Sequence, residues 1–167
     1  MFESKGLKEF FEKCKRAGSG DFKKELIQML EGLGFDFLRV IEDEILRRKV
    51  IDTRLLLASF QKGHSNDIWE YDEGGLTLEV GTNVEYARYV NDGHWTCKKG
   101  DAMRFVPGYW NGGKFTYDPS AKTGMMLKQK WVEGAHYWES GLKIMETMLP
   151  GILERKLQEW INIYFGG

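Results

Sequence analysis

The chain has 167 residues, which is within the usual size of one domain, and no proline-rich or serine-rich linker divides it. Its apolar fraction of 42% is ample for a packed core, and its 29% of charged residues favours a soluble surface. A formal charge of -1 excludes a global field that would draw the protein onto nucleic acid or an anionic membrane. The composition therefore predicts a single domain over residues 1–167.

Neither a membrane segment nor a cysteine framework is indicated. No apolar run approaches the length that spans a bilayer, and the N-terminus lacks the continuous apolar stretch of a signal peptide. The two cysteines, Cys14 and Cys97, form no CxxC pair that would indicate a zinc ribbon or a disulfide scaffold. We therefore predict no membrane partner and a reducing compartment.

The first fifty residues carry apolar side chains at helical spacing. Within residues 1–19, the spacing from Leu7 to Cys14 predicts a short helical arm that ends at a Gly-Ser-Gly run. A second apolar stripe predicts a long helix from Asp21 to the basic run Arg47-Arg48-Lys49, where cations favour the negative end of the helix dipole. Glycine is a poor helix former, so Gly32 and Gly34 are expected to weaken the middle of this helix and bend it.

A short helix and a hairpin are predicted next. Thr53 is a suitable N-cap for a helix that ends at Lys62-Gly63. The alternating segments Ile68–Tyr71 and Leu76–Val80, joined by a turn at Gly74-Gly75, then predict an antiparallel pair of strands.

A second capped helix and an insertion follow the hairpin. Thr82-Asn83 predicts the N-cap of a short helix, and Gly93 fits its C-terminal left-handed position. Residues 94–124 are irregular and rich in glycine, so they predict an inserted aromatic loop or hairpin. Alternation over Met125–Val132 predicts a further strand.

The last segment completes the predicted fold. A helical stripe from Tyr137 to Ile161 predicts a long terminal helix, which Pro150 is expected to kink. The elements together predict an α+β fold, in which a small antiparallel sheet of about three to four strands packs against N-terminal helices and a long C-terminal helix.

The sequence offers little catalytic chemistry. None of the three histidines, His64, His94 and His136, forms a recognisable catalytic or metal-binding motif. One alternative pairs Cys97 as a nucleophile with His94 or His136 as its base, because a thiolate needs a neighbouring imidazole to react near neutral pH. Another places His94, Cys97 and Asp101 around a metal, although three ligands do not close a site. We predict no enzyme, no cofactor and no metal, and keep a cysteine- or metal-dependent hydrolase as an alternative.

Acidic clusters offer no better site. Glu42-Asp43-Glu44 lies on a predicted helix, where successive side chains point in different directions, and Asp72-Glu73 lies in a predicted turn. Both are predicted to be solvated.

Six large aromatic residues fall in the predicted insertion, which is too rich in glycine to be a core element. They can fold back over the sheet, contact another subunit, or stack on single-stranded nucleic acid beside Lys98, Lys99, Arg104 and Lys114. They form the candidate subunit interface: Trp95, Phe105, Tyr109, Trp110, Phe115 and Tyr117.

Two segments carry a resemblance to a known family. The run Tyr86-Ala87-Arg88-Tyr89-Val90-Asn91-Asp92-Gly93 after the predicted hairpin, and Val132-Glu133-Gly134-Ala135-His136-Tyr137 before the terminal helix, resemble the small tail-component family of phages and prophages. The likeness covers about residues 50 to 165 and includes Asp52 to Phe60. The residues that identify the fold are Tyr86, Ala87, Tyr89, Val90, Gly93, Val132, Glu133 and Gly134.

This resemblance implies a virion structural protein of the tail neck. Members are also described as tail-completion or head-tail connector proteins, and they form rings, which require contacts between two different patches of neighbouring copies. The implied partners are further copies of the chain and adjacent tube, terminator or connector proteins, with DNA contact at most indirect. The implied location is a virion or phage-like particle after assembly in the host cytoplasm. The second segment is most similar to versions from contractile prophages and phage-tail-like bacteriocins.

Overall fold

The computed structural model describes residues 9, 12–15, 17–18, 20–50, 54–72, 74 and 77–165. The chain divides into two compact units, the first from residues 1–84 and 137–167 and the second from residues 85–136. The predicted arm over residues 1–19 lies mostly outside the described residues, although residues 12–15 and 17 are helical. A single domain over residues 1–167 stays a prediction, and each unit is described by itself.

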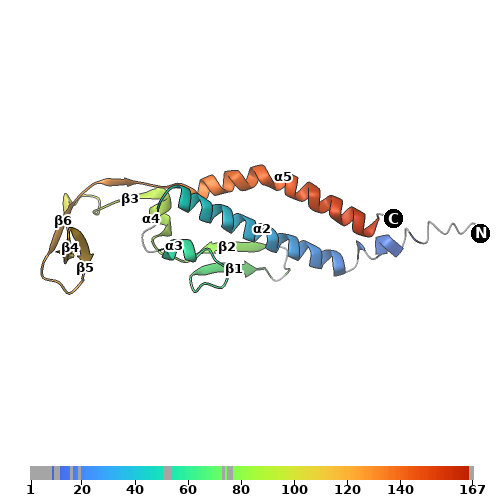
Figure 1. Ribbon diagram of the computed structural model, residues 1–167, viewed down its shortest axis with the longest axis horizontal. Helices are drawn as coiled ribbons and strands as arrows, with labels where there is room; N and C mark the ends of the chain where they lie inside the picture. Colours follow the sequence, from blue (N-terminus) through green and yellow to red (C-terminus); the bar gives the residue numbers. More distant parts are fainter. Residues whose placement is uncertain are drawn as a thin grey trace, which may run out of the picture. The chain divides into compact units, whose positions relative to one another are not determined.

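Two long helices are the largest elements of the first unit. Helix α2 (Gly20–Arg47) and helix α5 (Tyr137–Tyr164) lie side by side (Figure 1). A Cβ atom at Gly141 would lie 2.4 Å from Cδ1 of the fully buried Ile41, so glycine permits this close approach. Helix α5 continues through Pro150, and its ribbon curves near the middle in Figure 1.

A two-stranded hairpin packs on α2. Strands β1 (Asp67–Tyr71) and β2 (Leu78–Thr82) pair antiparallel, as the alternation predicts. At Gly34 of α2, an added Cβ would meet Cδ2 of Leu78 at 2.7 Å and the Trp69 ring at 3.0 Å. Gly34 is therefore the point at which the hairpin packs against the helix. The predicted strand residue Leu76 lies outside the described residues.

A buried chain of hydroxyl groups fixes the segment beside the hairpin. The Ser59 hydroxyl donates to the Leu56 carbonyl at 2.7 Å and accepts from the Thr82 hydroxyl at 2.7 Å. The same Thr82 oxygen accepts from the Val84 N–H at 3.1 Å. The fully buried Ser59 hydroxyl thus has both a donor and an acceptor, which removes the penalty for burying it. Thr82 does not cap a helix as predicted, because its oxygen is used in this turn.

Two helix boundaries differ from the predicted ones. Helix α3 (Leu55–Ala58) ends four residues before Lys62, because the backbone of Ser59 and Phe60 closes the last turn. The predicted cap Thr53 lies outside the described residues, and Arg54 occupies the cap position with φ of 62°.

Glu44 is buried, so the prediction of a solvated acidic face is wrong at this residue. Its carboxylate accepts from Arg47 Nε at 2.7 Å and from Arg48 Nε at 3.2 Å. Hydrogen bonds from Arg47 and Ser140 outweigh burial and lower the pKa of Glu44 to about 2. The basic run was predicted to interact with the negative end of the helix dipole, and two of its residues, Arg47 and Arg48, also pair directly with Glu44.

Glu44 predicts a pH dependence of stability. Because its folded pKa of about 2 is below the ordinary value of 4.5, its contribution is present above pH 4.5 and is lost as the pH falls toward 2. Glu44→Gln should lower the free energy of unfolding by about 2 kcal/mol at neutral pH, a figure discounted for the solvent exposure of Arg47. Urea unfolding at pH 7 and pH 3 should show this difference shrinking. Asp43→Asn, at an exposed neighbour, is the control, and a pH-independent difference for Glu44→Gln would count against the pairing.

The second unit is a short helix and five strands. Helix α4 (Ala87–Asp92) leads into β3 (Gly93–Trp95), which pairs antiparallel with β7 (Trp131–Glu133). Strand β4 (Met103–Asn111) is central to a three-stranded antiparallel sheet, flanked by β5 (Lys114–Tyr117) and β6 (Gly124–Lys128). Strands β4 and β5 thus form a hairpin within residues 94–124.

The single strand predicted over Met125–Val132 is two strands. Strand β6 pairs with β4, whereas β7 pairs with β3, and the chain changes partner at Gln129 and Lys130. Gln129 N–H donates to the Ala102 carbonyl, and Lys130 N–H donates to the Thr96 hydroxyl. The fold is α+β with a long C-terminal helix, as predicted, but its strands form three small sheets rather than one. Among the described residues, no helix is long and apolar enough to cross a membrane.

Candidate subunit interface

The second unit joins the two segments that carry the family resemblance. The Ala135 N–H donates to the Val90 carbonyl at 2.8 Å, and the His136 N–H donates to the Asn91 carbonyl at 2.9 Å. In the adjoining sheet, Gly93 pairs with Glu133 and His94 pairs with Val132. Residues about forty positions apart are therefore linked by backbone hydrogen bonds. These bonds hold the end of α4 against Ala135 and His136.

Two glycines permit this junction. A Cβ atom at Gly134 would lie 2.2 Å from the Asn91 carbonyl oxygen and 2.7 Å from the Gly93 nitrogen. Gly93 has φ of 84°, which favours glycine, and a Cβ there would lie 2.6 Å from the Val132 carbonyl oxygen. Gly93 has positive φ as predicted, but its ψ of 168° is extended rather than left-handed helical, because β3 begins at this residue.

The tyrosines of α4 do not fill a core. Tyr89 is 58% exposed and Tyr86 is 38% exposed, whereas Ala87 and Asn91 are the buried residues of this helix. Tyr86 and Tyr89 are therefore surface residues of this unit. The helix begins at Ala87, about one turn later than predicted, and its two buried residues, Ala87 and Asn91, lie four positions apart on one face. Sequence reasoning missed Asn91, whose polar side chain gave no apolar signal.

The six predicted interface aromatics lie in the second unit, and five of them are exposed. Trp110 and Tyr117 are 61% and 63% exposed, and Trp95, Phe105 and Tyr109 are each about half exposed, whereas Phe115 is half-buried. Two methionines that the sequence reading passed over, Met103 and Met126, are exposed beside them. The spacing of Met103 and Phe105, which is the two-residue period of one strand face, was the signal that could have found Met103.

The strand register assigns these side chains to two faces of the β5-β4-β6 sheet. Residues directly opposite in an antiparallel pair share a face, and successive residues alternate. Phe105 pairs with Met126, so these two lie with Met103 and Tyr109 on what we call the Phe105 face. Trp110 pairs with Phe115, and these two lie with Tyr117 on the opposite Trp110 face. Both faces of one small sheet thus carry exposed apolar side chains.

Two phenylalanine rings pack on glycines of neighbouring strands in this sheet. A Cβ at Gly124 would lie 2.6 Å from Cζ of Phe105, and a Cβ at Gly108 would lie 2.6 Å from Cζ of Phe115. Each ring therefore covers a glycine on the neighbouring strand, one on each face of the sheet. Trp110 and Phe115 also meet edge to face, with ring centroids 5.3 Å apart. The outer surfaces of Trp110, Tyr109 and Tyr117 are left for contacts beyond this unit.

Trp95 lies on the other sheet of the same unit. It is the direct cross-strand partner of Trp131, and the two rings meet edge to face with centroids 5.4 Å apart. Thr96 connects the two sheets, since its hydroxyl donates to the Lys128 carbonyl at 2.7 Å. Both sheets of the second unit therefore carry exposed aromatic side chains.

The structure gives the residues of the hydrolase alternative other partners. The Cys97 thiol is buried and donates to the Leu127 carbonyl at 3.3 Å. His94 Nδ1 lies 3.4 Å from the Tyr89 carbonyl oxygen, and the backbone N–H of His136 serves the α4 junction. Within the described ranges, no group of three or more His, Cys, Asp and Glu side chains is placed to hold a metal, so His94, Cys97 and Asp101 do not form one.

The nucleic-acid alternative gains little from the geometry. The register places Arg104 on the Trp110 face and Lys114 on the Phe105 face, while Lys98 and Lys99 lie in the loop after β3. The predicted basic residues are thus divided between surfaces, whereas binding to a single strand needs a basic groove that follows the stacking residues.

Comparison with known proteins identifies close relatives. Residues 5–93 match the HK97-gp10-like family, described as a bacteriophage HK97-gp10 tail-component. The Bacillus subtilis protein YqbI, uncharacterized by name, is 49% identical over 160 residues, covering 94% of this chain and 96% of that protein. XkdI of the Bacillus subtilis phage-like element PBSX is 44% identical over 157 residues, with the same coverage. No solved structure matches.

The extent of the match differs from the predicted one. The family match includes the first signature segment, Tyr86 to Gly93, and begins at residue 5 rather than near residue 50. The second segment, Val132 to Tyr137, lies outside that match but within the span shared with the two relatives, which covers most of the chain.

Proposed function

The chain belongs to the HK97-gp10-like family of phage tail components, and from this premise we propose that it forms a ring at the tail-completion layer, where a tail joins its head. The observation that carries the proposal is the β5-β4-β6 sheet, which presents exposed apolar side chains on both faces. Soluble monomers rarely leave extended apolar patches uncovered, and such patches mark surfaces for other proteins. The proposed partners are further copies of the chain and the adjacent tube, terminator or connector proteins.

The two faces suit the contacts that a ring needs. A ring arises when one patch meets a different patch on the next copy and the rotation closes. The Phe105 face carries Met103, Tyr109 and Met126, whereas the Trp110 face carries Phe115 and Tyr117, so the two surfaces differ in shape and chemistry. Aromatic and methionine side chains are also the types enriched in the centres of protein interfaces. We propose that the Trp110 face is the main contact between copies.

The function of such a ring is positional rather than chemical. Many copies arranged around one axis give a tail end a fixed diameter and several equivalent attachment points, and the repeated weak contacts add to a stable joint. The name of XkdI places that relative in a phage-like element, which supports a prophage origin for the particle. Our narrower proposal is that the particle is a contractile prophage tail or a phage-tail-like bacteriocin.

Loss of the chain should disrupt the joint. If the gene is removed from the phage or phage-like element that encodes it, electron micrographs of lysates should show tails with irregular ends and unjoined heads. The wild-type chain should restore normal particles, whereas a Trp110→Ser/Tyr117→Ser variant should not. Thr116→Ser, a substitution at an exposed residue on the opposite face of the same sheet, is the matched control. Particles that end and join normally without this protein would overturn the proposed function.

A further inference from the structure

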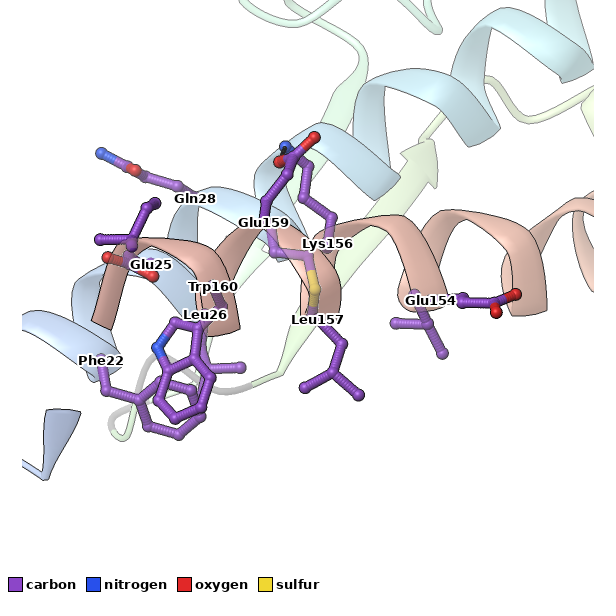
Figure 2. Close-up of a pocket in the computed structure, with 12 residues that line it drawn as sticks. Phe22, Glu25, Leu26, Gln28, Glu154, Lys156, Leu157, Glu159 and Trp160 are labelled. Atoms are coloured by element: carbon purple, nitrogen blue, oxygen red, sulfur yellow. Dashed lines mark hydrogen bonds and ion pairs between the residues drawn. The ribbon is translucent and has the colours of Figure 1, made fainter. Parts of the chain in front are cut away.

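An open apolar groove lies between the start of α2 and the end of α5 in the first unit. Its volume is about 610 Å³, and it is lined by Phe22, Leu26, Leu153, Leu157, Trp160 and Ile163 among other residues. Figure 2 shows Phe22, Leu26 and Trp160 gathered at one end, with Leu157 farther along the same groove. Leu157 and Ile163 are 57% and 62% exposed. The last two turns of α5 thus expose aliphatic side chains of the kind that usually lie in a core.

The aromatic end of the groove is organised but incomplete. The Trp160 ring meets Phe22 at 5.0 Å and Tyr164 at 5.3 Å between centroids, and the Tyr164 hydroxyl donates to Glu25 at 2.9 Å. The Trp160 indole N–H is buried and has no acceptor among the described residues. The ring cluster therefore closes only this end of the groove and leaves the side chains farther along it exposed.

The charges around the groove select the kind of partner. Of the described residues that line it, Glu25, Glu154 and Glu159 are acidic and Lys156 alone is basic, and Lys156 pairs with Glu159 at 2.8 Å. The same surface of a second copy would therefore bring like charges together, which disfavours a two-fold contact. A partner that is apolar on one side and basic overall fits this groove.

The N-terminal segment of the chain has this chemistry. Residues 1–16 contain five basic and three acidic residues, which gives them a net side-chain charge of +2. Their apolar residues include Leu7, Phe10, Phe11 and Cys14 at helical spacing, and helix-in-groove binding uses such a stripe. The described residues of this segment do not line the groove of their own chain.

We propose that the groove between α2 and α5 binds residues 1–16 of a neighbouring copy. This inference deepens the proposed function and rests on it for the closure of a ring. Each copy offers one basic arm and one acidic-rimmed groove, so the contact joins two different patches and continues from copy to copy. The arm adds to the contact made by the Trp110 face.

A disulfide cross-link tests the arm and the groove directly. Cys14 lies on the apolar stripe of the arm, so Leu157→Cys should place a second thiol against it. Under mild oxidation, non-reducing gels should show a ladder of dimers, trimers and larger linked species. Gln158→Cys is the matched control, because Gln158 is exposed on the same helix and does not line the groove. Neither this control nor Leu157→Cys with Cys14→Ser should give the ladder.

Each other outcome would decide against the inference or against the ring. A cross-link confined to monomers would show that the groove holds the chain's own arm, and dimers that persist without Cys14 would show a two-fold groove contact; either overturns the inference. Absence of any cross-link, with ring particles still visible by electron microscopy, would remove the arm contact and leave the proposed function standing. Dimers that require both Cys14 and the Leu157→Cys thiol, with nothing larger, would support the arm contact and overturn the ring.

Discussion

Gly134→Ala should lower the free energy of unfolding by more than about 3 kcal/mol, because the added methyl group would overlap backbone atoms. The new Cβ would lie 2.2 Å from the Asn91 carbonyl oxygen and 2.5 Å from the Asp92 carbonyl carbon. Both obstacles are backbone atoms, so the change cannot be absorbed by rotating a side chain. The hydrogen bonds from Ala135 and His136 to α4 would have to break or lengthen.

Thermal and urea unfolding, followed by tryptophan fluorescence, would measure this loss. The matched control is Gly151→Ala, because Gly151 lies in helix α5 and an added Cβ there meets nothing within 4 Å. That control should raise stability by about 0.5 to 1 kcal/mol, since alanine favours a helix. A Gly134→Ala protein as stable as the wild type would show that the two signature segments do not meet as described.

The second large effect is expected on assembly rather than on folding. Replacing both Trp110 and Tyr117 by serine should weaken association between copies by about 4 kcal/mol, on the order of a thousandfold, if each ring is a central contact. The two side chains are among the most exposed on their sheet, so their removal leaves the covered glycine contact of Phe115 in place. Sedimentation velocity over a range of protein concentrations would measure the shift toward monomers.

The controls separate this effect from misfolding. Thr116→Ser changes an exposed residue on the same strand but on the opposite face, and it should leave association unchanged. The far-ultraviolet circular dichroism of the Trp110→Ser/Tyr117→Ser variant should match that of the wild type. If this variant associates as the wild type does, the Trp110 face is not the contact between copies.

Periodicity predicted the parts of the fold whose burial is regular. The stripes of α2 and α5 were predicted nearly to their ends, because each of these helices places one continuous face against a neighbour. The hairpin β1–β2 was also predicted, since alternation and glycine at the turn agree. The α+β class follows from these three elements.

The remaining features depend on contacts between distant residues. Glu44 was predicted to be solvated because the spacing of apolar residues along a helix identifies only its apolar face. It does not show that one carboxylate accepts hydrogen bonds from two arginines. The residues from Met125 to Val132 alternate throughout, so the change of partner at Gln129 left no mark in the pattern. The exposure of Tyr86 and Tyr89 at α4 was not predicted, because the apolar character of a side chain alone does not show whether it is buried.

The candidate interface was identified by composition before its geometry was known. Six aromatics in a glycine-rich segment indicated a surface with a partner, but folding back over the chain remained equally open. The register resolves their directions, with Phe105 and Tyr109 on one face and Trp110 and Tyr117 on the other. The groove between α2 and α5 could not be found this way, because its apolar residues continue the same stripes that form the core.

The central claim is that copies of this chain close into a ring. Negative-stain electron microscopy of the purified protein, with class averages of end-on views, tests it most directly. The account predicts closed rings of one symmetry in the wild type, which are lost in the Trp110→Ser/Tyr117→Ser variant. A wild-type protein that stays monomeric at its highest soluble concentration, or that forms two-fold dimers and nothing larger, would contradict it.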